Sequence, residues 1–153
     1  MGLGGQEKGG EERALALHLI KLSVGSNDLA ELAGFQAQRR RELGRLIHFT
    51  RMMPKRRDEL LDGGSIYWVI RGVVRARQRI LDIESVTGGD GRAMTAVTLD
   101  PELVRTLPRS QRPFQGWRYL TAEQAPADLA AEAEGLAEMP PEMLAELREL
   151  GLL

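Results

Sequence analysis

Apolar and polar side chains alternate most regularly between residues 66 and 86. The even positions of this stretch carry Ile66, Trp68, Ile70, Val74, Ala76 and Ile80. Successive side chains of a β-strand point to opposite faces, so these residues would form one apolar face. The stretch also fits helical spacing tolerably, but its density of β-branched residues favours a strand. We predict one extended strand over Ile66–Val86, with Trp68 and Ile70 buried. A bulge is expected near Gln78–Ile80, where the apolar parity switches.

The odd positions of the same stretch carry arginines. They are Arg71, Arg75, Arg77 and Arg79, and Tyr67 shares their parity. A row of guanidinium groups on a strand backed by a core is typical of a phosphate-binding surface. Charged strand faces also serve only to keep proteins soluble, and this chain uses 18 arginines against three lysines throughout. A binding face and a solvated face therefore remain as alternatives.

Two strand–helix units are predicted before this stretch. The apolar run Leu15–Val24 predicts a strand that ends at Gly25. Ser26, Asn27 and Asp28 then offer N-cap oxygens to a helix that reaches about Leu43. Ile47–Met52 predicts a second, short strand.

A second helix is predicted to begin at Pro54 and to end at Asp62, before two glycines. Lys55, Arg56 and Arg57 crowd its first turn, where the helix dipole disfavours cations. Free N–H groups at a helix start attract anions, and added cations strengthen such a site. We therefore expect this turn, together with Arg51 before it, to contact phosphates. The simpler interpretation is that Asp58 and Glu59 neutralise these cations.

The remainder of the chain predicts further strands and a helical end. Gly88–Gly91 is a hairpin turn, and Met94–Leu99 returns as a strand. Pro101–Leu107 is expected to be a loop or short helix, and residues 108–113 irregular. Phe114–Leu120 is a last strand or ordered loop, and residues 121–153 are helical or frayed. The order β-α-β-α-β-β-β-α predicts an α+β fold, with a mixed, strongly curved sheet or a small barrel and flanking helices.

Charge is distributed unevenly along a chain whose net charge is −1. Residues 39–118 carry a net charge of +8, while residues 1–38 carry −2 and residues 119–153 carry −7. A basic middle with an acidic end indicates a polyanion site, or an end that folds back on the basic face. We expect a disordered tail over residues 1–13, a single domain over 14–129, and an acidic helical or frayed tail over 130–153.

The amino-acid composition limits the kinds of catalytic and metal sites that this chain can form. The chain has no cysteine, and its two histidines, His18 and His48, are not at metal-ligand spacing. It has neither a nucleophile elbow nor a Gly-rich phosphate loop, so we predict no catalytic residue, metal or cofactor. No apolar run approaches the ~20 residues of a membrane span, and the first residues do not resemble a signal peptide. A soluble cytoplasmic protein without a membrane partner is expected.

Aromatic side chains adjoin several arginines. Tyr67 shares a strand face with Arg71, and Trp117-Arg118-Tyr119 forms a second cluster. Bases of single-stranded RNA stack on such rings while arginines hold the phosphates. Tyr67 or Trp117 is therefore a candidate base-stacking residue, although Trp117 is also a candidate core residue because aromatic rings dominate protein cores.

The run from Phe49 to Gly72, FTRMMPKRRDELLDGGSIYWVIRG, resembles an uncharacterised bacterial family, domain of unknown function 1489. The resemblance extends to Leu17–Gly25, Arg77–Ile80, Leu99–Pro101 and Arg112–Leu120. It implies no activity. A weaker resemblance is to the PUA-like superfamily with its ASCH and EVE branches, and it rests on the basic helix, the Gly63-Gly64 turn and the later hairpin. It implies a curved mixed sheet that binds RNA or modified bases, although the ASCH branch's Gly-x-Lys-x-x-Glu-x-Arg pattern is missing.

The first hypothesis is a non-catalytic RNA-binding domain of PUA-like type. Its expected binding residues are Arg51, Lys55, Arg56, Arg57, Tyr67, Arg71, Arg75, Arg77, Arg79, Trp117 and Arg118. The second hypothesis is a small enzyme acting on a nucleotide or nucleoside, with Lys55 or Asp58 as the acid or base. The third is a protein-interaction module whose basic face meets an acidic partner.

Overall fold

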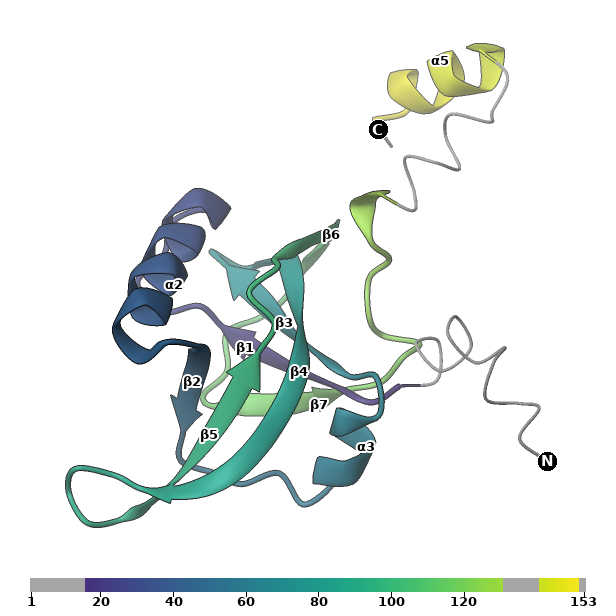
Figure 1. Cartoon of the computed structure of the whole chain (residues 1–153). Helices are drawn as coiled ribbons and strands as arrows, with labels where there is room; N and C mark the ends of the chain where they lie inside the picture. Colours follow the sequence, from purple (N-terminus) through teal and green to yellow (C-terminus); the bar gives the residue numbers. More distant parts are fainter. Residues whose placement is uncertain (1–15, 131–140, 152–153) are drawn as a thin grey trace, which may run out of the picture.

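The computed structural model describes residues 16–130 and 141–151 (Figure 1). Its strands are β1 (His18–Leu22), β2 (Leu46–Thr50), β3 (Ser65–Ile70), β4 (Val73–Thr87), β5 (Ala93–Leu99), β6 (Val104–Ser110) and β7 (Trp117–Leu120). Its helices are α2 (Leu29–Leu43), α3 (Arg57–Leu61) and α5 (Pro141–Glu149). The predicted tail over residues 1–13 lies outside the described residues, as does much of the predicted tail over 130–153.

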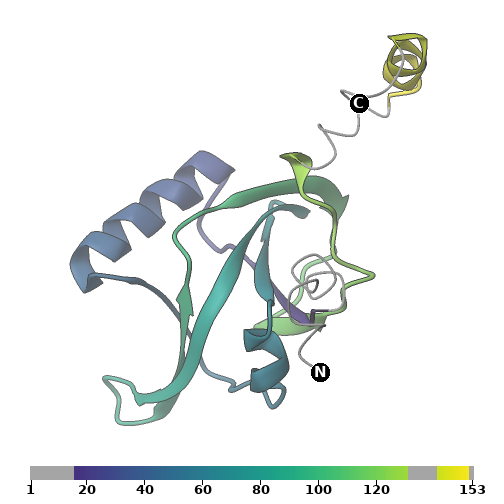
Figure 2. The ribbon, with the colours of Figure 1, turned by 45° about the vertical axis from the view of Figure 1, so that its right-hand side comes forward.

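The described strands form one mixed sheet in the order β2-β5-β4-β3-β1-β7, with β6 paired to β4 off this path. β1 and β3 run parallel, and the other neighbours are antiparallel. Figure 2 shows how strongly the sheet curves, with α2 along one side and α3 near the lower end of β4. The predicted α+β class and mixed curved sheet are confirmed, and the sheet does not close into a barrel.

The single strand predicted over Ile66–Val86 is wrong, because the chain reverses direction at Arg71 and Gly72. These two residues have φ angles of 51° and 80°, and Ile70 pairs with Val73 across the turn. Positive φ at both central residues is the geometry of a two-residue hairpin whose twist matches its strands. The stretch is thus the β3–β4 hairpin, and Arg71 belongs to its turn.

A bulge in β4 explains why apolar and polar residues alternate without interruption across the β3–β4 turn. Trp68 pairs with Ala76, whereas Val69 pairs with Val74, so Arg75 is the extra residue. The turn shifts the alternation by one residue and the bulge shifts it back. The even residues after the bulge therefore face the same side as Trp68. A second register shift lies between Ile80 and Asp82, just beyond the bulge predicted at Gln78–Ile80.

Local signals explain the boundaries of α2. Asp28 accepts a hydrogen bond from the backbone N–H of Glu31 at 2.8 Å, and the Glu31 side chain accepts one from the backbone N–H of Asn27 at 2.8 Å. This reciprocal cap satisfies donors that the helix start would leave free. Gly44, with φ 79°, ends the helix, and its N–H bonds the Arg40 carbonyl. The predicted helix is confirmed.

The second predicted helix is shorter than expected. α3 begins at Arg57, so Pro54, Lys55 and Arg56 precede it. The backbone N–H of Arg56 bonds the Tyr119 hydroxyl at 3.0 Å, which holds this residue outside the helix. A five-residue helix has little dipole with which to attract an anion. The helix-dipole argument therefore does not apply to Lys55 and Arg56, which precede the helix.

Two apolar clusters flank β3, all six residues of which are buried. The larger cluster joins Trp68 and Ile70 to Leu32 of α2 and Leu60 of α3. The smaller one gathers residues of the opposite face of β3 with neighbours on β1, β4 and β7: Ile20, Tyr67, Val69, Val74 and Leu120. The predicted burial of Trp68 and Ile70 is confirmed.

One strand was missed. Pro101–Leu107 was expected to be a loop or short helix, but β6 begins at Val104 and pairs with β4. The pairing is irregular, because Val74 pairs with Arg109 while Ala76 pairs with Arg105. Pro108 lies within that irregular stretch, where its missing N–H costs no ladder hydrogen bond. The order of elements thus contains two more strands than the sequence predicted.

Candidate nucleic-acid interface

Three arginines from separate parts of the sequence line one cleft. Arg71 comes from the β3–β4 turn, Arg75 from the bulge in β4, and Arg105 from β6. The cleft has a volume of about 640 Å³. All three side chains are exposed, and none forms an ion pair within the part of the chain that the structure describes. We call this feature the arginine cleft.

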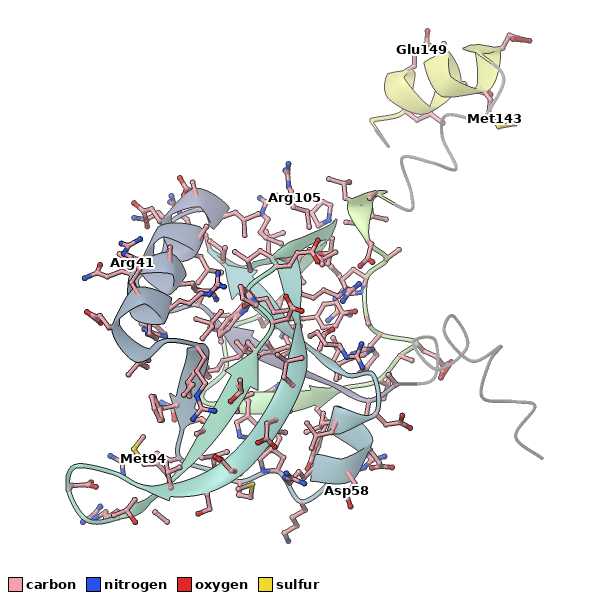
Figure 3. All side chains as sticks on the ribbon, in the orientation of Figure 1. Arg41, Asp58, Met94, Arg105, Met143 and Glu149 are labelled. Carbon is pink, nitrogen blue, oxygen red and sulfur yellow. The ribbon has the colours of Figure 1, made fainter. Side chains whose placement is uncertain are left out.

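The hairpin and the irregular β4–β6 pairing bring these arginines together. Arg105 lies opposite Ala76, next to the bulged Arg75. The N–H of Gln111, just after β6, bonds the Gly72 carbonyl at 2.8 Å and ties that end of the strand to the turn. Figure 3 shows Arg105 at the end of the molecule opposite the β4–β5 hairpin, where Met94 is labelled. Strand pairing and this hydrogen bond thus fix the backbone positions from which the three arginine side chains extend.

The start of α2 forms another wall of the cleft. Asn27, Asp28, Leu29 and Ala30 line it. Asp28 is the one acid among the lining residues, and its carboxylate accepts the backbone N–H of Glu31. The Asp28 carboxylate lies at this helix start and offsets part of the positive potential of the three arginines.

An ion pair between Arg77 and Asp128 holds the segment that forms a third wall of the arginine cleft. The guanidinium of Arg77 donates two hydrogen bonds to the Asp128 carboxylate, both at 2.7 Å, and a third to the Ser65 hydroxyl at 3.1 Å. Thr106 bridges to Asp128 in antiparallel fashion, and Leu129, the next residue, lines the cleft. The hydrogen bonds that Arg77 donates to Asp128 raise the pKa of Arg77. Arg77, expected to contact phosphate, instead holds this segment in place.

The basic residues around α3 are largely engaged with acids. Arg57 donates to the Ile83 carbonyl and to Asp82. Arg56 pairs with Glu59, and its guanidinium lies 5.5 Å from the centre of the Tyr119 ring. Lys55 is exposed on the surface. The interpretation in which local acids neutralise these cations fits this arrangement.

Arg51 and Arg79 lie outside the arginine cleft. Arg51 is exposed and lies 3.6 Å from Asp90, measured between Nη1 and Oδ2. Arg79 is exposed on β4 opposite Ser65, and its carbonyl accepts a hydrogen bond from the N–H of Asp100. The four arginines expected in one row are therefore divided between a turn, a bulge, an ion pair and an exposed strand position.

The two side chains expected to stack on bases, Tyr67 and Trp117, both contact other residues of the protein. Tyr67 is buried and packs edge-on against His18, with ring centres 5.0 Å apart. Trp117 donates its indole N–H to the Met52 carbonyl at 2.9 Å and packs against Tyr119. The guanidinium of Arg118 lies 4.6 Å from the centre of the Phe114 ring. None of these rings lines the arginine cleft.

Sequence reasoning found Arg71 and Arg75 but missed Arg105. Arg105 was missed because the strand β6 was not predicted: Pro101 before this strand and Pro108 within it favour a loop. A β-branched pair at Val104 and Thr106 is the one local hint of a strand.

A family model matches residues 19–153 of the chain, and its description is Protein of unknown function (DUF1489). The chain belongs to this family. This match confirms the resemblance to domain of unknown function 1489. No curated protein and no solved structure matches the chain.

The described residues lack two further features. No group of three or more histidine, aspartate or glutamate side chains gathers there in an arrangement that could hold a metal ion. Among the same residues, no helix has the length and apolar character to cross a membrane.

Proposed function

We propose that this protein is a non-catalytic nucleic-acid-binding domain, with RNA as its partner and the arginine cleft as its principal contact surface. The observation that carries the proposal is the convergence of Arg71, Arg75 and Arg105 on one cleft. Arginine is the side chain best suited to phosphate, because its planar fork can donate two parallel hydrogen bonds.

The charge distribution supports the same partner. Residues 39–118 carry a net charge of +8 within a chain of net charge −1. Within this segment Arg56, Arg57 and Arg77 are paired with acids, whereas no ion pair is found among the described residues for the three arginines of the cleft. Arg71, Arg75 and Arg105 outnumber the one acid, Asp28, among the described residues that line the cleft, and an excess of positive charge speeds the capture of a polyanion.

The lining of the cleft also indicates the mode of binding. None of the described residues that line it is aromatic, so base stacking inside the cleft is not expected. Contacts to phosphate and sugar position a nucleic acid without reading its sequence. We therefore propose backbone recognition with little sequence preference, in place of the stacking on Tyr67 or Trp117 expected from the sequence.

The proposal is tested by titrating labelled single-stranded RNA at several salt concentrations. Three phosphate contacts give a log–log slope of about −2, so affinity should fall about 20-fold between 50 and 200 mM salt. The test variant is Arg71→Asn with Arg75→Gln, because asparagine tolerates the positive φ of residue 71. Its slope should flatten to about −0.7, since one cleft arginine remains.

The matched control is Arg40→Gln with Arg41→Gln. Both arginines are exposed on α2 outside the arginine cleft, and the change in net charge is the same. Figure 3 shows Arg41 pointing outward from α2. The control should lose little affinity. Equal losses in both double variants would overturn the assignment of the cleft. Absence of binding by the unaltered chain at micromolar concentration and low salt would overturn the function and leave the enzyme and protein-partner hypotheses.

A further inference from the structure

A second cavity, distinct from the arginine cleft, lies between β1, β2 and α2. Its volume is about 220 Å³. It extends inward to Trp68 of β3 and Leu99 of β5. We call it the His48 cavity, after one of the residues that line it. Its size is below the roughly 300 Å³ at which pockets for drug-sized ligands begin, so a ligand of about one ring would fit.

His48 lines this cavity and carries an unsatisfied polar atom. Its Nε2 is buried and has no hydrogen-bond partner among the described residues. The ring packs edge-on against Trp68, with centres 5.3 Å apart, which fixes its orientation. Buried polar atoms almost always have a partner, and an exception calls for a specific explanation such as a ligand.

The charge of the lining identifies the kind of ligand. Lys21 of β1 and Arg39 of α2 both line the cavity, and the lining contains no carboxylate. Burial, followed by the positive charges of Lys21 and Arg39, lowers the pKa of His48 to about 4. Burial also lowers the pKa of Lys21. Because both cations line the cavity beside His48, an anion bound there would offset their field at the imidazole.

The rim of the cavity is apolar. Val24, Phe35 and Phe49 all line it and are exposed, at 89%, 49% and 43% of their surface. Exposed aromatic side chains around a polar centre are typical of a site that covers the carbon body of a ligand.

We propose that the His48 cavity binds a small organic anion. The acidic group, a carboxylate or a phosphate, lies between Lys21 and Arg39. A shift of the side chains that enclose His48 Nε2 lets the acidic group accept its N–H. The carbon body packs against Phe35 and Phe49. A neutral imidazole can carry its proton on Nε2, so His48 serves as a donor without being charged.

The test is an NMR titration of the full chain with four ring compounds: benzoate, phenyl phosphate, the neutral benzamide and the cationic benzylamine. Benzoate or phenyl phosphate should shift the His48 ring signals at millimolar concentration, and the tighter of the two identifies the acidic group. Benzamide should bind about tenfold more weakly, the effect of one charge-assisted hydrogen bond. The bound anion should also raise the pKa of His48, because it offsets the charges of Lys21 and Arg39.

Variants separate a built site from general attraction. Arg39→Gln should weaken the tighter anion about tenfold, whereas Arg40→Gln, with the same charge change on α2 outside this cavity, should not. His48→Phe keeps a ring against Trp68 and should also lose the anion. Binding of benzamide or benzylamine as tight as that of the anions would overturn the proposal. So would no shift of His48 with either anion, or equal losses in the Arg39 and Arg40 variants.

Discussion

Gln78 on β4 is the polar residue whose removal should destabilise the fold most. It is completely buried. Its Oε1 accepts hydrogen bonds from Gln36 Nε2 and from Trp68 Nε1, both at 2.8 Å. Its Nε2 donates to Gln36 Oε1 at 2.8 Å and to the Asp100 carbonyl at 3.1 Å. One side chain thus joins α2, β3 and the segment after β5.

The two glutamines share the same pair of hydrogen bonds but should not cost the same to replace. Gln78→Leu leaves the buried amide of Gln36 and the indole N–H of Trp68 without partners. Each orphaned group costs about 1–3 kcal/mol, so the variant should lose about 4 kcal/mol of unfolding free energy. Gln36→Leu leaves Gln78 bonded to Trp68 and Asp100, so it should cost about 1 kcal/mol.

The double variant provides the sharpest part of this prediction. Adding Gln36→Leu to Gln78→Leu removes an orphaned amide, so the double variant should be more stable than Gln78→Leu alone by about 1–2 kcal/mol. Urea unfolding of the full chain, followed by circular dichroism, measures all four free energies. Equal losses of unfolding free energy in the two single variants would refute the reasoning. A double variant less stable than Gln78→Leu alone would also refute it.

Three further predictions concern stability. Asp128→Asn leaves the guanidinium of Arg77 unpaired with its side chain 11% exposed, and should cost about 2–3 kcal/mol in urea unfolding. Gly64→Ala would place a methyl group against the backbone carbonyl oxygen of Leu17, so it should cost about 3 kcal/mol by the same measurement. The lowered pKa of His48 means that the unfolded chain gains a proton first as pH falls, so unfolding free energy should drop by about 2 kcal/mol between pH 6.5 and 5.

Each has a control within the chain. Asp58→Asn removes an exposed partner of Arg57 and should change the unfolding free energy little. A loss as large as that of Asp128→Asn would contradict the prediction for Asp128. Gly89→Ala meets no atom within 4 Å, so similar losses at both glycines would contradict the second. His48→Phe should remove its share of the pH dependence, and an unchanged pH profile would contradict the third.

Local signals made part of the fold predictable. The helix α2 has its own caps at Asp28 and Gly44, and β7 ends a short aromatic-rich run. The β3–β4 hairpin was not predictable in the same way, because its turn shifts the alternation of side chains and the bulge at Arg75 restores it. Two compensating shifts leave the same pattern as one straight strand.

The candidate site was predictable only in part for a related reason. Arg71 and Arg75 were identified, although on the assumption of a continuous strand. Arg105 joins them through the pairing of β6 with β4, a long-range contact that no local pattern encodes. The roles of Tyr67 and Arg77 depend on what packs against them, namely His18 and Asp128, and neither contact can be derived from spacing in the sequence.

The central claim is that RNA binds in the arginine cleft, and mapping of amide chemical shifts during an RNA titration tests it most directly. Uniformly ¹⁵N-labelled protein is titrated with single-stranded RNA at low salt. We predict that the largest changes lie at Arg71, Arg75 and Arg105 and at residues 27–30, and that added salt reverses them. Changes confined to the outer face of α2 or to the region of α3, or no changes at all, would contradict the claim.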